Sequence, residues 1–285
     1  PTAICQNITV QLGAAGNAAI TANDVNGGSN DACGIASTSV APNTFICANV
    51  GSNNVVLTVN DNNGNSSNCN ANVEVQDNVN PTAICQDITI QLDAGGNASI
   101  TTSQIDNGSN DACGIASMSV SPNTFDVNNV GDNNVTLTVN DNNGNSSICT
   151  AVVTVQDDGA PTALCQDITV YLDGAGTVGI LATDVDNGSN DPSGIDTMIV
   201  TPNTFGCVNV GGNIVTLDVT DNNGNSAQCT ATVTVFDTIP PTAFCQNITV
   251  QLDAGGNASI TANDVDGSSN DACGIASTSV APNAF

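Results

Sequence analysis

Residues 55–76 read VVLTVNDNNGNSSNCNANVEVQ. Apolar residues fill every second position on both sides of the turn sequence DNNGNS, namely Val55, Leu57 and Val59 before it and Cys69, Ala71, Val73 and Val75 after it. A period of two predicts strands with one buried face. Asn and Gly tolerate the left-handed backbone of a tight turn, so the stretch predicts an antiparallel hairpin.

The residues before this hairpin show the same short pattern. Further strands are predicted at 8–12, 18–22 and 35–40 and near Phe45. A polar loop at 23–34 and a turn at Pro42–Asn43 separate them, and no window shows helical periodicity with caps. Six or seven short strands with frequent turns predict an all-β fold, an antiparallel immunoglobulin-like β-sandwich.

This pattern recurs every 80 residues without insertion or deletion. The predicted domains are 1–80, 81–160, 161–240 and a truncated fourth copy, 241–285. A fixed long period is typical of a linear array of similar modules. The ending inside the fourth copy favours a segment of a longer array. The alternative is a subunit whose fourth module is completed by strands from a neighbouring molecule.

The charge of the chain is extreme, because 27 acidic residues face no Lys, Arg or His and the net charge is -27. Such a chain should be repelled by nucleic acid and anionic membranes, and no apolar run approaches the roughly 18 residues of a membrane span. Disorder is the rival interpretation of an acidic chain. The 40% hydrophobic content and its strand pattern favour a folded protein.

Twelve cysteines in recurring positions predict an oxidising, extracellular location. Every complete copy contains one pair with the same spacing, Cys5 and Cys69, Cys85 and Cys149, and Cys165 and Cys229. Each pair is predicted to form a disulfide that contributes about 4 kcal/mol on the chain-entropy model.

The remaining cysteines do not recur in every copy. We predict a Cys33–Cys47 bond in the first copy, which leaves Cys113 and Cys207 single because the second copy has Val127 and the third has Ser193. The two single cysteines are either free thiols or bridges to another module or chain.

Three phrases of the second copy carry a family resemblance: CQDITIQLD at 85–93, DNGSNDACGI at 106–115 and VGDNNVTLTVNDNNGNSSICTAVVTVQD at 130–157. They resemble the hyalin-repeat (HYR) type of immunoglobulin-like domain, especially the tandem copies in secreted surface proteins of Bacteroidetes-like bacteria. The resemblance implies an extracellular sandwich with a role in adhesion or surface architecture, and no enzyme activity. The chain departs from a typical member in lacking basic and indole side chains.

The acidic residues fall into columns when the copies are compared. Three columns are Asp wherever the chain reaches them: Asp31/Asp111/Asp191/Asp271, Asp61/Asp141/Asp221 and Asp77/Asp157/Asp237. Two more are Asp in most copies: Asp106/Asp186/Asp266 and Asp24/Asp184/Asp264. If consecutive strands run up and down, the column of Asp77 should lie beside the polar loop and hairpin of the following copy.

This placement predicts calcium sites where copies meet. The predicted ligand groups are Asp77, Asp106, Asp111 and Asp141; Asp157, Asp158, Asp184, Asp186, Asp191 and Asp221; and Asp237, Asp264, Asp266 and Asp271, with Asp24, Asp31 and Asp61 as their equivalents in the first copy. Clustered carboxylate and amide oxygens suit calcium, and without a cation they would repel one another. The alternative is that recurring Asp residues only hydrogen-bond their own loop backbone.

These observations predict a structural component of an extracellular filament, fibre or stalk, assembled from copies of itself end to end or side by side. No catalytic residue is predicted, because His and Lys are absent. The alternatives are binding modules for a glycan or a cell-surface partner and spacer domains of a large secreted enzyme. A single Tyr171 and no Trp argue against sugar stacking.

Overall fold

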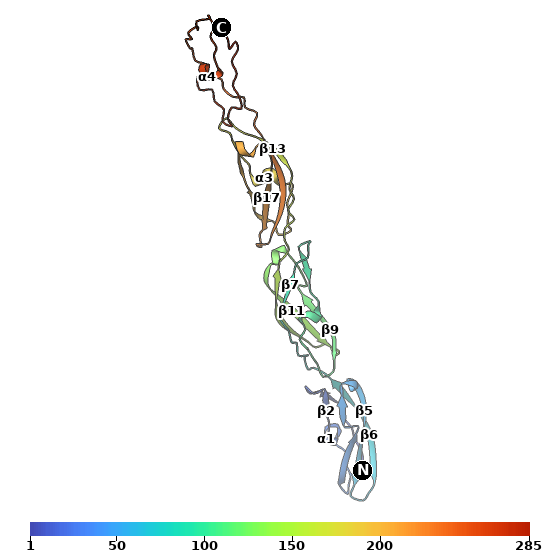
Figure 1. Ribbon diagram of the computed structural model, residues 1–285. Helices are drawn as coiled ribbons and strands as arrows, with labels where there is room; N and C mark the ends of the chain where they lie inside the picture. Colours follow the sequence, from blue (N-terminus) through green and yellow to red (C-terminus); the bar gives the residue numbers. More distant parts are fainter. The chain divides into compact units, whose positions relative to one another are not determined.

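The computed structural model describes every residue from Pro1 to Phe285. Contacts divide the chain into two compact units, one of Pro1–Asp93 with Asn97–Gln156 and one of Ala94–Gly96 with Asp157–Phe285. The domain boundaries at 80-residue intervals therefore stay a prediction. Within the units the same succession of strands occurs three times (Figure 1).

The first copy confirms the predicted hairpin, which is formed by two strands of 11 residues each. Its elements are β1 (Ile8–Gln11), β2 (Asn17–Ala19), α1 (Ala22–Val25), β3 (Ile35–Ala41), β4 (Thr44–Ile46), η1 (Cys47–Asn49), β5 (Gly51–Asp61) and β6 (Ser66–Gln76). One sheet has the order β1-β6-β5-β3, and β2 pairs with β4 in a second sheet. The fold is thus an all-β, immunoglobulin-like sandwich.

The next two copies repeat this arrangement. In the second, the elements are β7 (Ile88–Gln91), β8 (Asn97–Ser99), α2 (Thr102–Ile105), β9 (Ile115–Ser121), β10 (Thr124–Asp126), η2 (Val127–Asn129), β11 (Gly131–Asp141) and β12 (Ser146–Gln156). In the third, they are β13 (Ile168–Tyr171), β14 (Thr177–Gly179), α3 (Ala182–Val185), β15 (Ile195–Thr201), β16 (Thr204–Gly206), η3 (Cys207–Asn209), β17 (Gly211–Asp221) and β18 (Ser226–Phe236). The fourth copy contains α4 (Ala262–Val265).

Two details differ from the sequence predictions. The β1–β6 pair is parallel, with Ile8 opposite Val73, whereas every other pair in this copy is antiparallel. Only strands joined by a tight turn must be antiparallel, and β1 is far from β6 in the chain. The short helices were also not predicted. In α1 the Asp24 carboxylate accepts hydrogen bonds from the N–H and hydroxyl of Thr21, and four residues are too few for a visible period.

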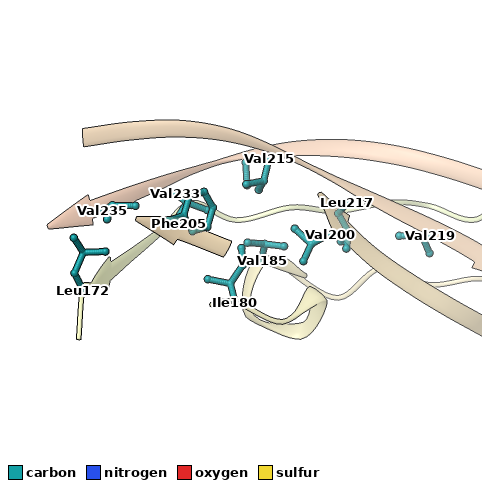
Figure 2. Close-up of a cluster of buried hydrophobic side chains, with 11 residues drawn as sticks. Leu172, Ile180, Val185, Val200, Phe205, Val215, Leu217, Val219, Val233 and Val235 are labelled. Atoms are coloured by element: carbon teal, nitrogen blue, oxygen red, sulfur yellow. The ribbon is translucent and has the colours of Figure 1, made fainter. Parts of the chain in front are cut away.

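Each complete copy has its own hydrophobic core between the two sheets. In the third copy, Val185 of α3, Phe205 of β16 and Leu217 of β17 belong to one cluster, together with Val233 and Val235 of β18 (Figure 2). Val233 and Leu217 are fully buried, as alternation along the two long strands predicts. These cores are small because aromatic residues make up 2% of the chain.

Three disulfides confirm the predicted pairing within copies: Cys5–Cys69, Cys85–Cys149 and Cys165–Cys229. The predicted Cys33–Cys47 bond is wrong. The seven residues of β3 carry the chain about 23 Å from Cys33, and the three residues of β4 cannot bring it back within the roughly 7 Å that a disulfide allows between Cα atoms.

Cys47 instead bonds Cys113 of the next copy, with the Cα atoms 5.1 Å apart. Cys207 bonds Cys273 in the same way. Of the two alternatives left open for Cys113 and Cys207, bridging between modules is therefore the one observed. Cys33 and Cys245 are free and exposed.

Candidate metal centre

Four carboxylates are the buried charged side chains of the molecule: Asp61, Asp77, Asp141 and Asp221. All four come from two of the columns that the sequence singled out. A buried charge is unfavourable unless hydrogen bonds or an opposite charge compensate it, and no Lys, Arg or His is available. The partners of these four side chains therefore decide what the clusters can do.

In each complete copy, the Asp at the start of the hairpin turn accepts hydrogen bonds from that turn; these residues are Asp61, Asp141 and Asp221. The Asp141 Oδ1 atom accepts hydrogen bonds from the N–H groups of Asn143 and Asn145, each at 2.8 Å, and Oδ2 accepts one from the Asn145 side chain at 2.7 Å. Burial raises the pKa of Asp141, but these hydrogen bonds outweigh burial and the pKa lies below its ordinary value. Asp141 is thus a carboxylate at neutral pH.

The same asparagine joins the hairpin to the preceding copy. The Asn145 side-chain amide donates to the backbone carbonyls of Asp77 and Val79, at 3.1 and 3.3 Å. In the other unit, Asn225 donates to the carbonyl of Asp157 at 2.9 Å. The column of Asp77 therefore lies beside the hairpin of the following copy, as strand direction predicted.

Asp77 has one satisfied and one unsatisfied oxygen. Its Oδ1 accepts a hydrogen bond from the Val79 N–H at 3.1 Å. Its Oδ2 is buried and has no hydrogen-bond partner, and the residue is only 6% exposed. A carboxylate oxygen buried without a partner is costly, so this atom needs a cation or another donor.

Asp111 lies close to the Asp77 carboxylate. One carboxylate oxygen of each acid and the Cys113 Sγ lie within 4.8 Å of one another. Oxygens that each bind calcium at about 2.4 Å can be no more than about 4.8 Å apart, so the two carboxylates are close enough to share an ion. Cys113 is in a disulfide and offers no thiolate.

The second unit contains two related groups. Asp157, Asp191 and Asp221 bring three carboxylates within 4.8 Å, and Asp237 and Asp271 are similarly close, with Cys273 as the third member. In the first copy, the Pro1 ammonium lies 3.2 Å from Asp31 Oδ2 and 3.9 Å from Asp61 Oδ2.

The other predicted ligands are not in these groups. Asp24, Asp184 and Asp264 accept hydrogen bonds at the N-termini of their short helices, whereas Asp106, Asp186 and Asp266 accept them from the N–H groups of the loop that follows. Hydrogen bonds from Ser109 lower the pKa of Asp106, and the N–H of Thr21 lowers that of Asp24. Asp158 is exposed. These residues match the alternative of acids that stabilise their own loops.

Two features of the site were not predicted. One is the asparagine of Asn65, Asn145 and Asn225, which recurs in every hairpin and could have been found by comparing copies. The other is the pairing of Cys47 with Cys113 and of Cys207 with Cys273, although a bridge between modules was one of the alternatives left open for Cys113 and Cys207. In each of these disulfides the two cysteines are 66 residues apart. The equivalent positions that would link the second and third copies are Val127 and Ser193, so both cysteines are missing there.

Five disulfides are typical of proteins from oxidising compartments. None of the helices in the structure has the length and apolar character needed to cross a membrane.

Comparisons with known proteins give structural neighbours only. No protein-family model matches the chain, and no curated protein matches it. Similar solved structures include cadherin domains 1–4 of protocadherin gamma B7 (12% identity, 90% of this chain and 81% of that one, TM-score 0.37). Others are titin domains I67–I69 (9%, 82% and 97%, 0.33) and Drosophila N-cadherin EC1–4 (14%, 65% and 58%, 0.33). We assign the fold from the chain's own sheets and transfer no function from these structures.

Proposed function

We propose that the chain is a structural component of an extracellular filament, fibre or stalk, built from tandem immunoglobulin-like repeats that calcium stiffens. The role is mechanical rather than catalytic. The observation that carries the proposal is the pair of disulfides between consecutive copies, Cys47–Cys113 and Cys207–Cys273. Each of these disulfides is a second covalent link besides the peptide chain, so it restricts movement between the two copies that it joins, as a stiff structural array requires.

The acidic groups support the calcium part of the proposal. Asp157 directly follows β12, the last strand of the second copy, whereas Asp191 and Asp221 belong to the third copy. An ion shared by the three would fix the start of that copy to the segment that enters it. Calcium suits the site better than magnesium, because calcium accepts six to eight oxygens in flexible geometry.

Thermal unfolding with and without calcium tests this proposal. At about 100 times Kd, one bound ion stabilises the folded state by about 2.7 kcal/mol, which is about 10–20 °C in Tm for a domain of this size. The Asp157→Asn variant keeps the Oδ1 acceptor for the Gly159 N–H but removes one charge. We expect its Tm to fall in calcium and to rise in EDTA, because the substitution weakens the site and relieves repulsion.

The matched control is Asp196→Asn, which removes the same charge from an exposed position on β15. This variant should shift Tm by similar small amounts in both buffers. A wild-type Tm that is the same in calcium and in EDTA would contradict the calcium proposal.

Electron microscopy of the native material tests the architectural part of the proposal. Long fibres would support this part, and isolated short rods would contradict it.

A second candidate function is side-by-side contact between copies of the chain. On the outer face of the third copy, Tyr171 and Phe236 stack with ring centroids 6.0 Å apart. The same columns hold a hydrogen-bonded glutamine pair in the other complete copies, Gln11–Gln76 and Gln91–Gln156. Ile199 and Ile214 are also exposed where the other copies have Ser and Asn.

A second copy is the partner that this face fits, because strongly anionic chains without basic side chains can approach one another only over uncharged surface. Replacing Tyr171 and Phe236 by Gln restores the residues of the other copies. We expect this double variant to lose the self-association of the wild type in sedimentation equilibrium at moderate salt. Equal association of both proteins, or none in the wild type, would remove this candidate.

A further inference from the structure

The candidate metal centre of the first unit and the disulfide between its copies share one short loop. The Cys113 N–H donates to Asp111 Oδ1 at 2.7 Å, and Cys113 Sγ lies within 4.8 Å of the carboxylates of Asp77 and Asp111. Cys47 supplies the other sulfur. Asp77 and Cys47 thus belong to one copy, and Asp111 and Cys113 to the next, so ion and disulfide would join the same two bodies.

The disulfide holds this loop closely against the first copy. A Cβ on Gly16, whose φ is +69°, would lie 2.8 Å from Cys47 Sγ and 3.1 Å from the Ala112 Cβ. The loop therefore packs against the turn of the first copy without spare room. The closed disulfide also holds Asp111 close to the carboxylate of Asp77, whose Oδ2 is buried without a hydrogen-bond partner.

Without a cation, this approach places two negative charges together where the chain offers no basic side chain. A divalent cation would remove that repulsion and would give the buried Asp77 carboxylate a partner. Conversely, the closed disulfide holds both ligands in place, so binding costs less ordering of the loop. Each event favours the arrangement that the other needs.

We infer that calcium binding at Asp77 and Asp111 and formation of the Cys47–Cys113 disulfide are coupled. Calcium makes this disulfide more resistant to reduction, and the closed disulfide raises the affinity of the site for calcium by the same factor. This inference rests on the proposed calcium site and adds to it a redox control of its strength. Couplings of this kind are typically about 5- to 150-fold.

The redox step is ordinary thiol–disulfide exchange with glutathione. Two molecules of reduced glutathione give two electrons and two protons to Cys47–Cys113. The protein S–S bond breaks into two thiols, and the S–S bond of glutathione disulfide forms. The reverse reaction closes the bridge.

The second unit provides an internal control. Its group of Asp157, Asp191 and Asp221 has Ser193 at the position of Cys113, and the Ser193 N–H donates to Asp191 Oδ1 at 2.7 Å. The N–H hydrogen bond of the loop is therefore the same. The Ser193 hydroxyl also donates to Asp191 Oδ1, at 2.6 Å, and no disulfide is attached to this loop. Removing Cys47–Cys113 should leave this site unchanged.

Calcium titration followed by backbone amide NMR resolves the two sites in one sample. The Val79 N–H donates to Asp77 and the Gly159 N–H to Asp157, so each reports on its own site. In the double variant Cys47→Ser with Cys113→Ser, we expect the Kd seen at Val79 to rise at least about fivefold, with no change at Gly159. An unchanged Kd at Val79 would overturn the coupling. A wild type without a calcium response at either amide would instead overturn the proposed function.

A second measurement uses the wild-type disulfides, so it does not depend on the folding of the variant. The protein is equilibrated in glutathione buffers with calcium or EDTA, alkylated and mapped by mass spectrometry. Calcium should shift the reduction midpoint of Cys47–Cys113 towards higher reduced glutathione and leave Cys85–Cys149 unchanged. The Asp77→Asn variant should lose the shift. Equal midpoints in calcium and EDTA, for a protein shown to bind calcium, would count against the inference.

Discussion

Replacing both Cys85 and Cys149 by Ala should lower the free energy of unfolding of the second sandwich by about 4 kcal/mol. The disulfide closes a loop with a sequence separation of 64, and its main effect is to restrict the unfolded chain. The sandwich has little core to compensate, because an 80-residue domain is marginal on burial alone. A urea titration followed by circular dichroism should show a separate transition at lower urea.

The matched control is Cys33→Ala, which removes a free and exposed thiol. It should leave the urea profile unchanged, since no covalent bond and little buried surface are lost. If the Cys85/Cys149 variant also unfolded at the wild-type urea concentration, the small-core account of these domains would be wrong.

Replacing Leu137 by Ala should destabilise the same sandwich by about 2–5 kcal/mol. Leu137 lies on β11 opposite Cys149 and is fully buried in the core of the second copy. The substitution leaves a cavity that the surrounding Val side chains of two sheets cannot fill without moving. The loss is measured from the same urea titration.

Ile148 is the control for Leu137. It is the neighbour of Cys149 on β12, and its side chain is 65% exposed. Replacing Ile148 by Ala should change stability by less than about 0.5 kcal/mol, as is usual for surface positions. Similar losses for both variants would show that the alternating pattern does not define the inner face.

The sequence predicted the strands well because their signal is local. Alternation around DNNGNS determines both the β5–β6 hairpin and its inner face, and this pattern needs no knowledge of the rest of the fold. The disulfides within copies were equally accessible, since Cys5 and Cys69 recur at fixed spacing. The parallel pairing of β1 with β6 could not be predicted in this way, because it depends on how distant parts of the chain meet.

The site was predicted only in part, for the same reason. The reasoning from strand direction correctly brought Asp77 near Asp111, because it used the polarity of the whole module. It also included Asp106, whose carboxylate is instead occupied by the Ser109 and Gly108 N–H groups. Whether an acid turns to its own loop or to a neighbouring copy depends on side-chain rotation, which spacing alone does not determine.

The Cys33–Cys47 error has a similar physical origin. The presence of both cysteines in the first copy suggested a bond within it, but the extended β3 separates the two residues. The spacing of 66 residues between Cys47 and Cys113 was available in the sequence. It becomes meaningful only when the end of one module is placed beside the start of the next.

The proposed function depends most on a divalent cation between the carboxylates of consecutive copies. A crystal structure of the protein grown in calcium tests it most directly through the anomalous signal of the ion. We expect one peak between the carboxylates of Asp77 and Asp111, with an oxygen of each about 2.3–2.6 Å away, and a second peak among Asp157, Asp191 and Asp221. Carboxylates that turn apart to water, with no anomalous peak at either place, would contradict it.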